Sequence, residues 1–349
     1  MKFIRSLLAV LITGPMAAQN PLAIPPLLQQ DTFDLTVAPS TMEFYPGKLT
    51  NTYGINSPYL GPTLVLQKGD TARFRVHNQL GEVTTMHWNG MEVPPEYDGS
   101  PPREVLPGET WDVAFKVIDK ASVYVYHPHT MDLIGQQVGK GAAGLIIVQD
   151  DEEAQLALPR TYGVDDFPIA VQDKRFSPTG QFIFGPYGDS ILVNGTPDPY
   201  LEAPAQVVRL RLLNASTARY YMFGFEGGTP FHVIAGEGGL LAVPDTLDRL
   251  MLSSGERVEL LLDLTGMEGD SLLLMSYGSE LPGTIPGGEN LLWEHSILNG
   301  IDFPILRIRV GAPTSEPVTI IPATLANVQP YPEASASVTR VKEITGLGM

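Results

Sequence analysis

The stretch ARFRVHN, Ala72 to Asn78, alternates apolar and polar residues one by one. A period of two is typical of a β-strand that has one face buried and the other in water. Further segments of this kind are short, rich in β-branched and aromatic residues, and bounded by Gly, Pro or Asp. They lie at Phe33 to Ala38, Thr71 to His77, Thr110 to Val117 and Ala143 to Val148. The pattern predicts an all-β fold, with these strands in a sandwich or barrel.

The same pattern returns in a second block between residues 159 and 312, for example in RVELLLDL at Arg257 to Leu264. A chain of 349 residues is also long enough for two domains of roughly 150 residues each. We therefore expect two successive all-β domains, at residues 20–150 and 159–312. The acidic, helix-prone stretch from Asp150 to Leu158 is the predicted connector. Residues 313–349 show no sustained strand pattern, and we expect them to be a linker towards a missing third domain.

The first residues have the character of an export signal. Lys2 and Arg5 precede an apolar stretch from Leu7 to Ile12, and small residues follow at Ala17 and Ala18. This order predicts a cleavable signal peptide at residues 1–19 and a periplasmic or extracellular protein. The alternative is a short buried or membrane-anchoring helix, but the stretch is shorter than the roughly 20 residues needed to span a bilayer. No later segment is long and apolar enough to span one either, so we expect no membrane span.

The charge and the cysteine content exclude several classes of function. The formal net charge is −17, which repels phosphate backbones and anionic membranes, so nucleic acid is not an expected partner. An acidic surface favours solubility and is compatible with attracting cations, including metal ions. The sequence contains no cysteine, so it offers neither disulfides nor a thiolate nucleophile or metal ligand.

Three of the six histidines are concentrated in two short motifs, HWNG at His87 to Gly90 and YHPHT at Tyr126 to Thr130. In an extended strand, His127 and His129 face the same way, so their nitrogens can meet one metal ion or two neighbouring ions. Pro128 between them stiffens this arrangement. Imidazole suits copper, zinc, iron and nickel, so the residue types alone do not choose the metal.

Longer motifs resemble those of a known family. The first part of the chain contains GPTLVLQKGD at Gly61 to Asp70, NQLGEVTTMHWNG at Asn78 to Gly90, PREVLPGETWDVAFKV at Pro102 to Val117, YHPH at Tyr126 to His129, and GKGAAGLIIVQD at Gly139 to Asp150. The second part contains ILVNGTPDPYL at Ile191 to Leu201, VRLRLLNAS at Val208 to Ser216, and SSGERVELLLDL at Ser253 to Leu264. In content and order these motifs resemble the first two domains of the multicopper oxidases, which include the laccases. The resemblance implies two consecutive cupredoxin-like Greek-key β-barrels, or sandwiches.

The resemblance also implies roles for individual residues. His87 matches the first histidine of the family's His-Trp-His-Gly motif, a ligand of the type 2 copper. Asn89 stands where the second histidine binds a type 3 copper, and an amide oxygen is a poorer copper ligand. His127 and His129 match type 3 copper ligands. Asp98 matches an acidic residue of the family's proton relay, and its alternative role is that of a turn residue before Gly99.

Other parts of the family's machinery are missing from the sequence. A type 1 copper site needs a cysteine thiolate, and the third-domain ligand patterns His-x-x-His-x-His and His-Cys-His are absent. We expect His232 and His295 to be packing histidines, because the family binds no copper in the second domain.

Three hypotheses follow from this mixture. The first is a truncated or degenerate laccase-like oxidoreductase that keeps a partial copper site. The second is a copper-free exported scaffold or interaction protein, similar to the family's cell-division relatives. The third is a copper-binding carrier. Copper ions are the expected partner, and a chain that supplies the third domain, or a second copy of this chain, could complete a site.

Overall fold

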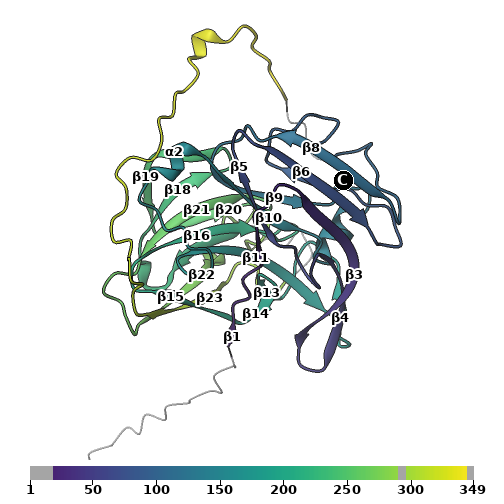
Figure 1. Ribbon diagram of the computed structural model, residues 1–349. Coiled ribbons are helices and arrows are strands. Elements are labelled where there is room, and N and C mark those ends of the chain that lie inside the picture. Colours follow the sequence, from purple (N-terminus) through teal and green to yellow (C-terminus); the bar gives the residue numbers. More distant parts are fainter. Residues whose placement is uncertain (1–18, 290–295, 344–349) are drawn as a thin grey trace, which may run out of the picture.

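The structure is a computed structural model that describes residues 19–289 and 296–343 (Figure 1). Within these residues, strands in four sheets make up most of the regular structure, and the helices are short. The prediction of an all-β fold is confirmed. The described part contains no helix that is both long and apolar enough to span a bilayer. His295 and the predicted signal peptide, apart from Gln19, lie outside the described residues.

The first sandwich packs a four-stranded sheet against a five-stranded sheet. The order in the four-stranded sheet is β4 (Lys48–Ile55), β3 (Phe33–Tyr45), β6 (Thr71–Asn78) and β8 (Thr110–Lys116). The order in the five-stranded sheet is β2 (Leu27–Leu28), β5 (Thr63–Gln67), β10 (Gly144–Gln149), β9 (Ser122–His127) and β7 (His87–Asn89). Strand β6 alternates exposed and buried positions, so Phe74 and Val76 reach the core between the two sheets.

The second sandwich packs a six-stranded sheet against an eight-stranded sheet. The order in the six-stranded sheet is β1 (Asn20–Pro21), β15 (Pro199–Pro204), β23 (Asp302–Gly311), β22 (Ser271–Tyr277), β17 (Tyr221–Phe225) and β20 (Leu250–Leu252). The order in the eight-stranded sheet is β14 (Thr196–Pro197), β13 (Ser190–Val193), β11 (Asp166–Phe176), β16 (Val207–Asn214), β21 (Arg257–Asp263), β18 (Phe231–Gly236) and β19 (Gly239–Leu247), with β12 (Phe182–Ile183) beside β11. The sheets of both sandwiches stay open and do not close into barrels.

The helices of the described part are short connections between strands. They are α1 (Ile134–Gly139), α2 (Asp151–Ala154), η1 (Glu226–Gly228), η2 (Gly278–Glu280) and η3 (Glu333–Ser335). Helix α2 begins at the cap residue Asp150, whose side chain accepts a hydrogen bond from the Glu153 backbone N–H at 2.8 Å. This helix lies in the acidic connector that the sequence predicts.

The two sandwiches touch through the outer face of the five-stranded sheet. Val123, Val125 and Leu145 are buried against Ala170 and Leu213 of the eight-stranded sheet. The neighbouring residues of β9, such as Tyr124 and Tyr126, point the other way into the first core. Alternation along β9 therefore supplies both the core and the contact between the sandwiches.

The connector is tied to the second sandwich by buried ion pairs. Glu153 accepts a hydrogen bond from Arg209 at 2.8 Å, and Arg209 also pairs with Glu259. Glu259 is fully buried and accepts a second guanidinium hydrogen bond, from Arg211, at 2.6 Å. Arg211 in turn forms a bidentate pair with Asp166 at 2.8 Å. We call these five residues the buried ion network.

Part of the predicted linker lies on the surface of the second sandwich. Val318, Ile321 and Leu325 pack against a small apolar cluster that includes Leu158 and Ile234. The Leu325 backbone N–H donates to the Ala242 carbonyl at 2.9 Å. Residues 313–327 therefore follow the eight-stranded sheet before the chain turns away, as the yellow segment of Figure 1 shows.

Candidate metal site

The site begins with the pairing of β7 and β9. The two strands run antiparallel, with His87 directly opposite His127 and Asn89 opposite Val125. Trp88, between the two polar residues of β7, is fully buried, and its ring centre lies 4.0 Å from that of Phe74. Because strand residues alternate in direction, burying Trp88 places His87 and Asn89 on the opposite face. The core therefore sets the direction of the first histidine.

Three imidazole rings gather at this end of the five-stranded sheet. His129 follows His127 after Pro128, just beyond the end of β9. The ring centre of His87 lies 5.6 Å from that of His127 and 5.1 Å from that of His129, and the last two are 6.1 Å apart. We call His87, His127 and His129 the histidine cluster. The structure brings His87 together with two histidines that lie 40 and 42 residues further along the sequence, since 127 − 87 = 40 and 129 − 87 = 42.

Hydrogen bonds determine which nitrogen two of these rings present. His87 Nδ1 lies 2.9 Å from the Asp98 carbonyl oxygen, and His127 Nδ1 lies 2.9 Å from the Pro128 carbonyl oxygen. A carbonyl oxygen only accepts, so each Nδ1 must carry the proton and donate it. In the neutral rings Nε2 then keeps its lone pair. Metal-binding histidines have this arrangement, with one nitrogen donating to a carbonyl and the other free to bind the metal.

The third ring has a polar atom without a partner. His129 Nδ1 is buried and forms no hydrogen bond in the structure. Leaving a buried polar atom unpaired costs about 1–3 kcal/mol. A metal ion that accepted this lone pair would remove the penalty, so the donor chemistry of the cluster fits copper, for which imidazole is a suitable ligand.

The protonation state of His127 also favours metal binding. The pKa of His127 is lowered to about 4, mainly by burial; the hydrogen bond to Pro128 partly opposes this shift, and the neighbouring rings of His87 and His129 contribute to it. The ring is therefore neutral at physiological pH. Only the neutral ring has a lone pair available for a metal.

Asp98 contacts His87 in two ways. Its carbonyl oxygen accepts the Nδ1 hydrogen bond, and its carboxylate oxygen Oδ1 lies 3.2 Å from the same nitrogen. The hydroxyl of Ser100 donates to the other carboxylate oxygen. This geometry holds the imidazole of His87 in one orientation and one tautomer. Asp98 therefore contacts His87, a candidate metal ligand, and its position fits the role of orienting that imidazole. The sequence motif did not reveal this contact.

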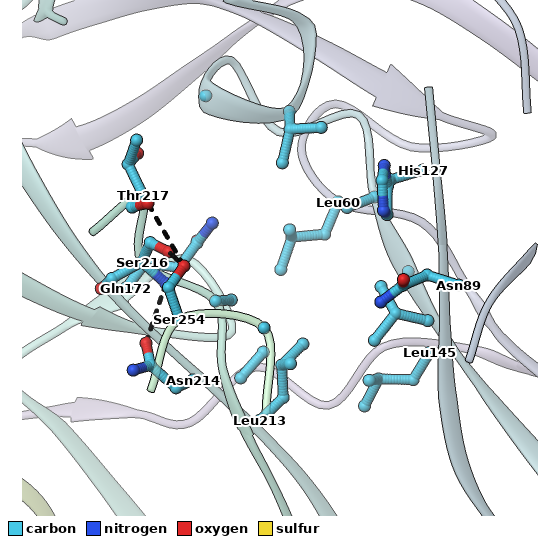
Figure 2. A pocket seen from close by; sticks show the side chains of 18 of the residues that line it. Leu60, Asn89, His127, Leu145, Gln172, Leu213, Asn214, Ser216, Thr217 and Ser254 are labelled. Carbon is cyan, nitrogen blue, oxygen red and sulfur yellow. Dashed lines mark hydrogen bonds between the residues drawn. The ribbon is translucent and has the colours of Figure 1, made fainter. Parts of the chain in front are cut away.

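Asn89 lies on the wall of a cavity of about 310 Å³ between the two sandwiches. His127 lines the same wall, and Figure 2 shows the two side chains near Leu60 and Leu145, across the cavity from Thr217. Asn89 is therefore on the His87 face of β7, but it faces the cavity between the sandwiches.

The ring centres have the spacing expected of a metal site, but the ring nitrogens do not converge on one point. In residues 19–289 and 296–343, no group of three or more His, Cys, Asp or Glu side chains is arranged to hold one metal ion. Metal–nitrogen bonds of about 2.0–2.1 Å place the ring centres of two imidazoles on one ion roughly 5–6 Å apart. The register of β7 and β9 places the rings of His87 and His127 side by side, and the spacing of the three rings is the feature that fits a metal ion.

The remaining described histidines lie elsewhere. His77 bonds Thr110 and the carboxylate of Asp34, and His232 bonds the hydroxyl of Thr246 at 2.9 Å. Both have protein partners, and neither belongs to the histidine cluster. Lys174, a buried lysine on the wall of the cavity, could not be singled out from the sequence. Its strand pattern does not distinguish it from an exposed strand lysine.

Comparison with known proteins agrees with this architecture. A family model for multicopper oxidases matches residues 36–153. The chain is 39% identical over 257 residues to the cell division protein FtsP of Escherichia coli, covering 71% of this chain and 54% of the relative. It is 40% identical over 265 residues to FtsP of Edwardsiella tarda, covering 73% and 56%. The chain thus spans about half the length of the curated relatives it matches.

Solved structures of multicopper oxidases superpose on both sandwiches. McoA multicopper oxidase from Aquifex aeolicus matches with a TM-score of 0.81 and 33% identity, over 91% of this chain and 70% of that one. The laccase-like multicopper oxidase CueO from Ochrobactrum sp. matches with a TM-score of 0.80 and 32% identity, over 90% and 69%. These matches confirm the cupredoxin-like fold expected from the sequence. With this identity and coverage, the chain belongs to the multicopper oxidase family.

Proposed function

We propose that the chain binds copper through His87, His127 and His129. The observation that carries the proposal is the convergence of these three rings, with centre-to-centre distances of 5.1–6.1 Å. Two of them donate Nδ1 to carbonyl oxygens, and the third has an unpaired buried nitrogen. Membership of the family makes copper the first metal to test. Bound copper would supply redox chemistry at this site.

The chain's own residues prepare the site for the metal. Asp98 holds His87 in one tautomer, and the fold of β9 holds His127 neutral and largely shielded from water. In this proposal Asp98 is a positioning residue for His87. Proton delivery by its carboxylate is the further role that the family resemblance suggests.

We do not propose independent laccase turnover. None of the 349 residues is a cysteine, so none can be the thiolate ligand of a type 1 copper. In this proposal, electrons would have to reach the histidine cluster through another chain, such as one that supplies a third domain. Within the family, this chain is then a copper-binding protein whose oxidoreductase activity depends on that partner.

Copper retention tests the proposal. Purified chain is loaded with copper, desalted and analysed for metal, beside His127→Ala and the matched control His232→Ala. His232 is also a strand histidine, but it lies in the second sandwich and bonds Thr246. We expect the wild type and His232→Ala to retain copper and His127→Ala to lose most of it. Equal copper in all three proteins would contradict the proposal.

A second candidate function is that of a copper-free scaffold in cell division. The specific observation is the 39% identity over 257 residues to a protein named for cell division. Asn89, in place of a histidine, also favours a site that has lost its metal. Cells of the source organism that lack the gene would be complemented with wild type and with a variant lacking all three cluster histidines. Rescue of division by the copper-free variant would favour the scaffold over the copper protein.

Export and domain limits are part of the same proposal. We infer that residues 1–19 direct export and are removed, and that residues 20–150 and 159–312 form the two domains, followed by a linker. The amino-terminal sequence of the protein recovered from the periplasm or medium tests the first point. Finding Met1 at the mature terminus would contradict removal.

A further inference from the structure

The cavity between the two sandwiches contains a buried charge that the copper proposal does not use. Lys174 lies on β11, is 9% exposed, and lines this cavity together with His127 on the other sandwich. Its Nζ donates to the Gly139 carbonyl at 2.8 Å and lies 5.4 Å from the ring centre of Phe182. An ammonium has three N–H donors, so two of them have no hydrogen-bond acceptor among the described residues.

The neighbouring carboxylate does not pair with this ammonium. Asp173, the residue before Lys174 on β11, points to the other side of the strand and pairs with Arg219 at 2.8 Å. Among the described residues, Lys174 forms no ion pair with any Asp or Glu. Burial lowers the pKa of Lys174 to about 8, and Asp173 partly opposes this shift. The side chain is therefore still mostly charged at neutral pH, inside an environment that disfavours charge.

Several other polar groups on the wall already have partners within the protein. The amide of Asn194 bonds the backbone of Ala170 and Pro168, and the amide of Asn214 bonds the carbonyls of Arg219 and Leu252. Ser216 bonds the hydroxyl of Tyr221. Figure 2 shows Asn214 and Ser216 on one wall, across the cavity from His127. Lys174 is thus the charged group with donors to spare.

Apolar side chains form much of the remaining wall. Leu60, Val138, Leu145, Ala170 and Leu213 line the space, which has a volume of about 310 Å³. Small-molecule sites have volumes of about 300–1,000 Å³, mostly apolar walls and a few convergent polar groups. This cavity is at the small end of that range, and the charge on its wall, that of Lys174, is positive.

We propose that the cavity is a binding site for a small aromatic or branched monocarboxylate, with the carboxylate on Lys174 and the apolar body against Leu145 and Leu213. The carboxylate would accept the two free N–H donors and neutralise the buried ammonium. The apolar body would pack against both sandwiches, with Leu145 from the first and Leu213 from the second. Such a ligand would therefore bridge the two sandwiches near His127.

Cinnamate is a suitable probe, and cinnamamide is its neutral counterpart with the same apolar body. Binding to the full chain is measured by titration calorimetry, with and without added copper. We expect saturable binding of one cinnamate per chain, at least tenfold tighter than that of cinnamamide and equal in both metal states. Cinnamate that binds no tighter than cinnamamide, or shows no saturable binding, would overturn the proposal. Binding only in the presence of copper would overturn it too, since it would place the carboxylate on the metal.

Substitutions test whether Lys174 supplies the positive charge that binds the carboxylate. Lys174→Met keeps the length and apolar stem of the side chain, and we expect it to weaken cinnamate at least tenfold and to leave cinnamamide unchanged. Lys116→Met on the exposed face of β8 is the matched control and should bind cinnamate like the wild type. Unchanged cinnamate affinity in Lys174→Met would overturn the assignment. If that variant does not fold, the comparison of the two probes on wild type still decides whether the site selects a carboxylate.

Discussion

Replacing Asp98 by alanine tests how the histidine cluster is held. The change removes the carboxylate oxygen 3.2 Å from His87 Nδ1 but keeps the backbone carbonyl that accepts from the same nitrogen at 2.9 Å. Losing an outer partner of a metal-binding histidine costs about 10–100-fold in metal affinity. Because one of two acceptors remains, we expect the lower end, about tenfold or ~1.4 kcal/mol.

Competition with a copper chelator of known affinity measures this change as a shift in Kd. Asp98→Asn keeps an oxygen acceptor and loses the charge, so its affinity should fall between those of wild type and Asp98→Ala. Ser100→Ala removes only the hydroxyl that bonds the carboxylate and should have a smaller effect than Asp98→Ala. Thermal unfolding of each variant checks that the fold is intact. Equal copper affinity in wild type and Asp98→Ala would refute the view that Asp98 positions His87.

Three further predictions concern the site and the fold. Asn89→His places an imidazole beside His127. Chelator competition should show about tenfold tighter copper binding in this variant than in Asn89→Gln. Equal binding by the two variants would mean that this position cannot reach the metal. Trp88→Ala empties a fully buried position and should lower the free energy of unfolding in urea by about 3–5 kcal/mol, and a loss below ~1 kcal/mol would contradict its role as the anchor of β7. Glu259→Gln leaves two buried guanidiniums short of one negative charge and should cost about 3 kcal/mol, whereas the exposed Glu202→Gln should cost less than ~1 kcal/mol.

The Glu259 prediction has a pH dependence of known sign. Burial alone would raise the pKa of this carboxyl, but the guanidiniums of Arg209 and Arg211 outweigh burial and hold it below its usual value of 4.5. A lowered folded-state pKa contributes stability that is complete above the unfolded-state pKa and is lost as the pH falls through the folded-state value. The stability difference between wild type and Glu259→Gln should therefore shrink at acid pH. A difference that grew on acidification would show that the pairing is wrong.

Sequence periodicity predicted much of the fold because strand alternation is a local property. The segments at Thr71 to His77 and Thr110 to Val117 correspond to β6 and β8 to within one residue at either end. The open form of the sheets was not predictable in this way. It depends on which strands pair at the edges, and that pairing joins residues far apart in the chain.

The residues of the candidate site were predictable and their surroundings were not. The motifs gave His87, His127 and His129, and the register of β7 and β9 brings them together. The contact of Asp98 with His87 depends on a loop conformation that no periodic pattern describes. Lys174 was missed because its burial depends on the first sandwich packing against β11, and the sequence does not show how the two sandwiches are placed.

The direct pairing of His87 with His127 ties the site to the folding of the first sandwich. A slip of one residue between these strands would turn the indole of Trp88 towards water and an imidazole towards the apolar interior. Formation of the correct interior therefore delivers both rings to the same place before any ion arrives. Unlike a zinc finger, which folds only around its metal, this end of the five-stranded sheet should be assembled in the metal-free chain and ready for an ion to enter.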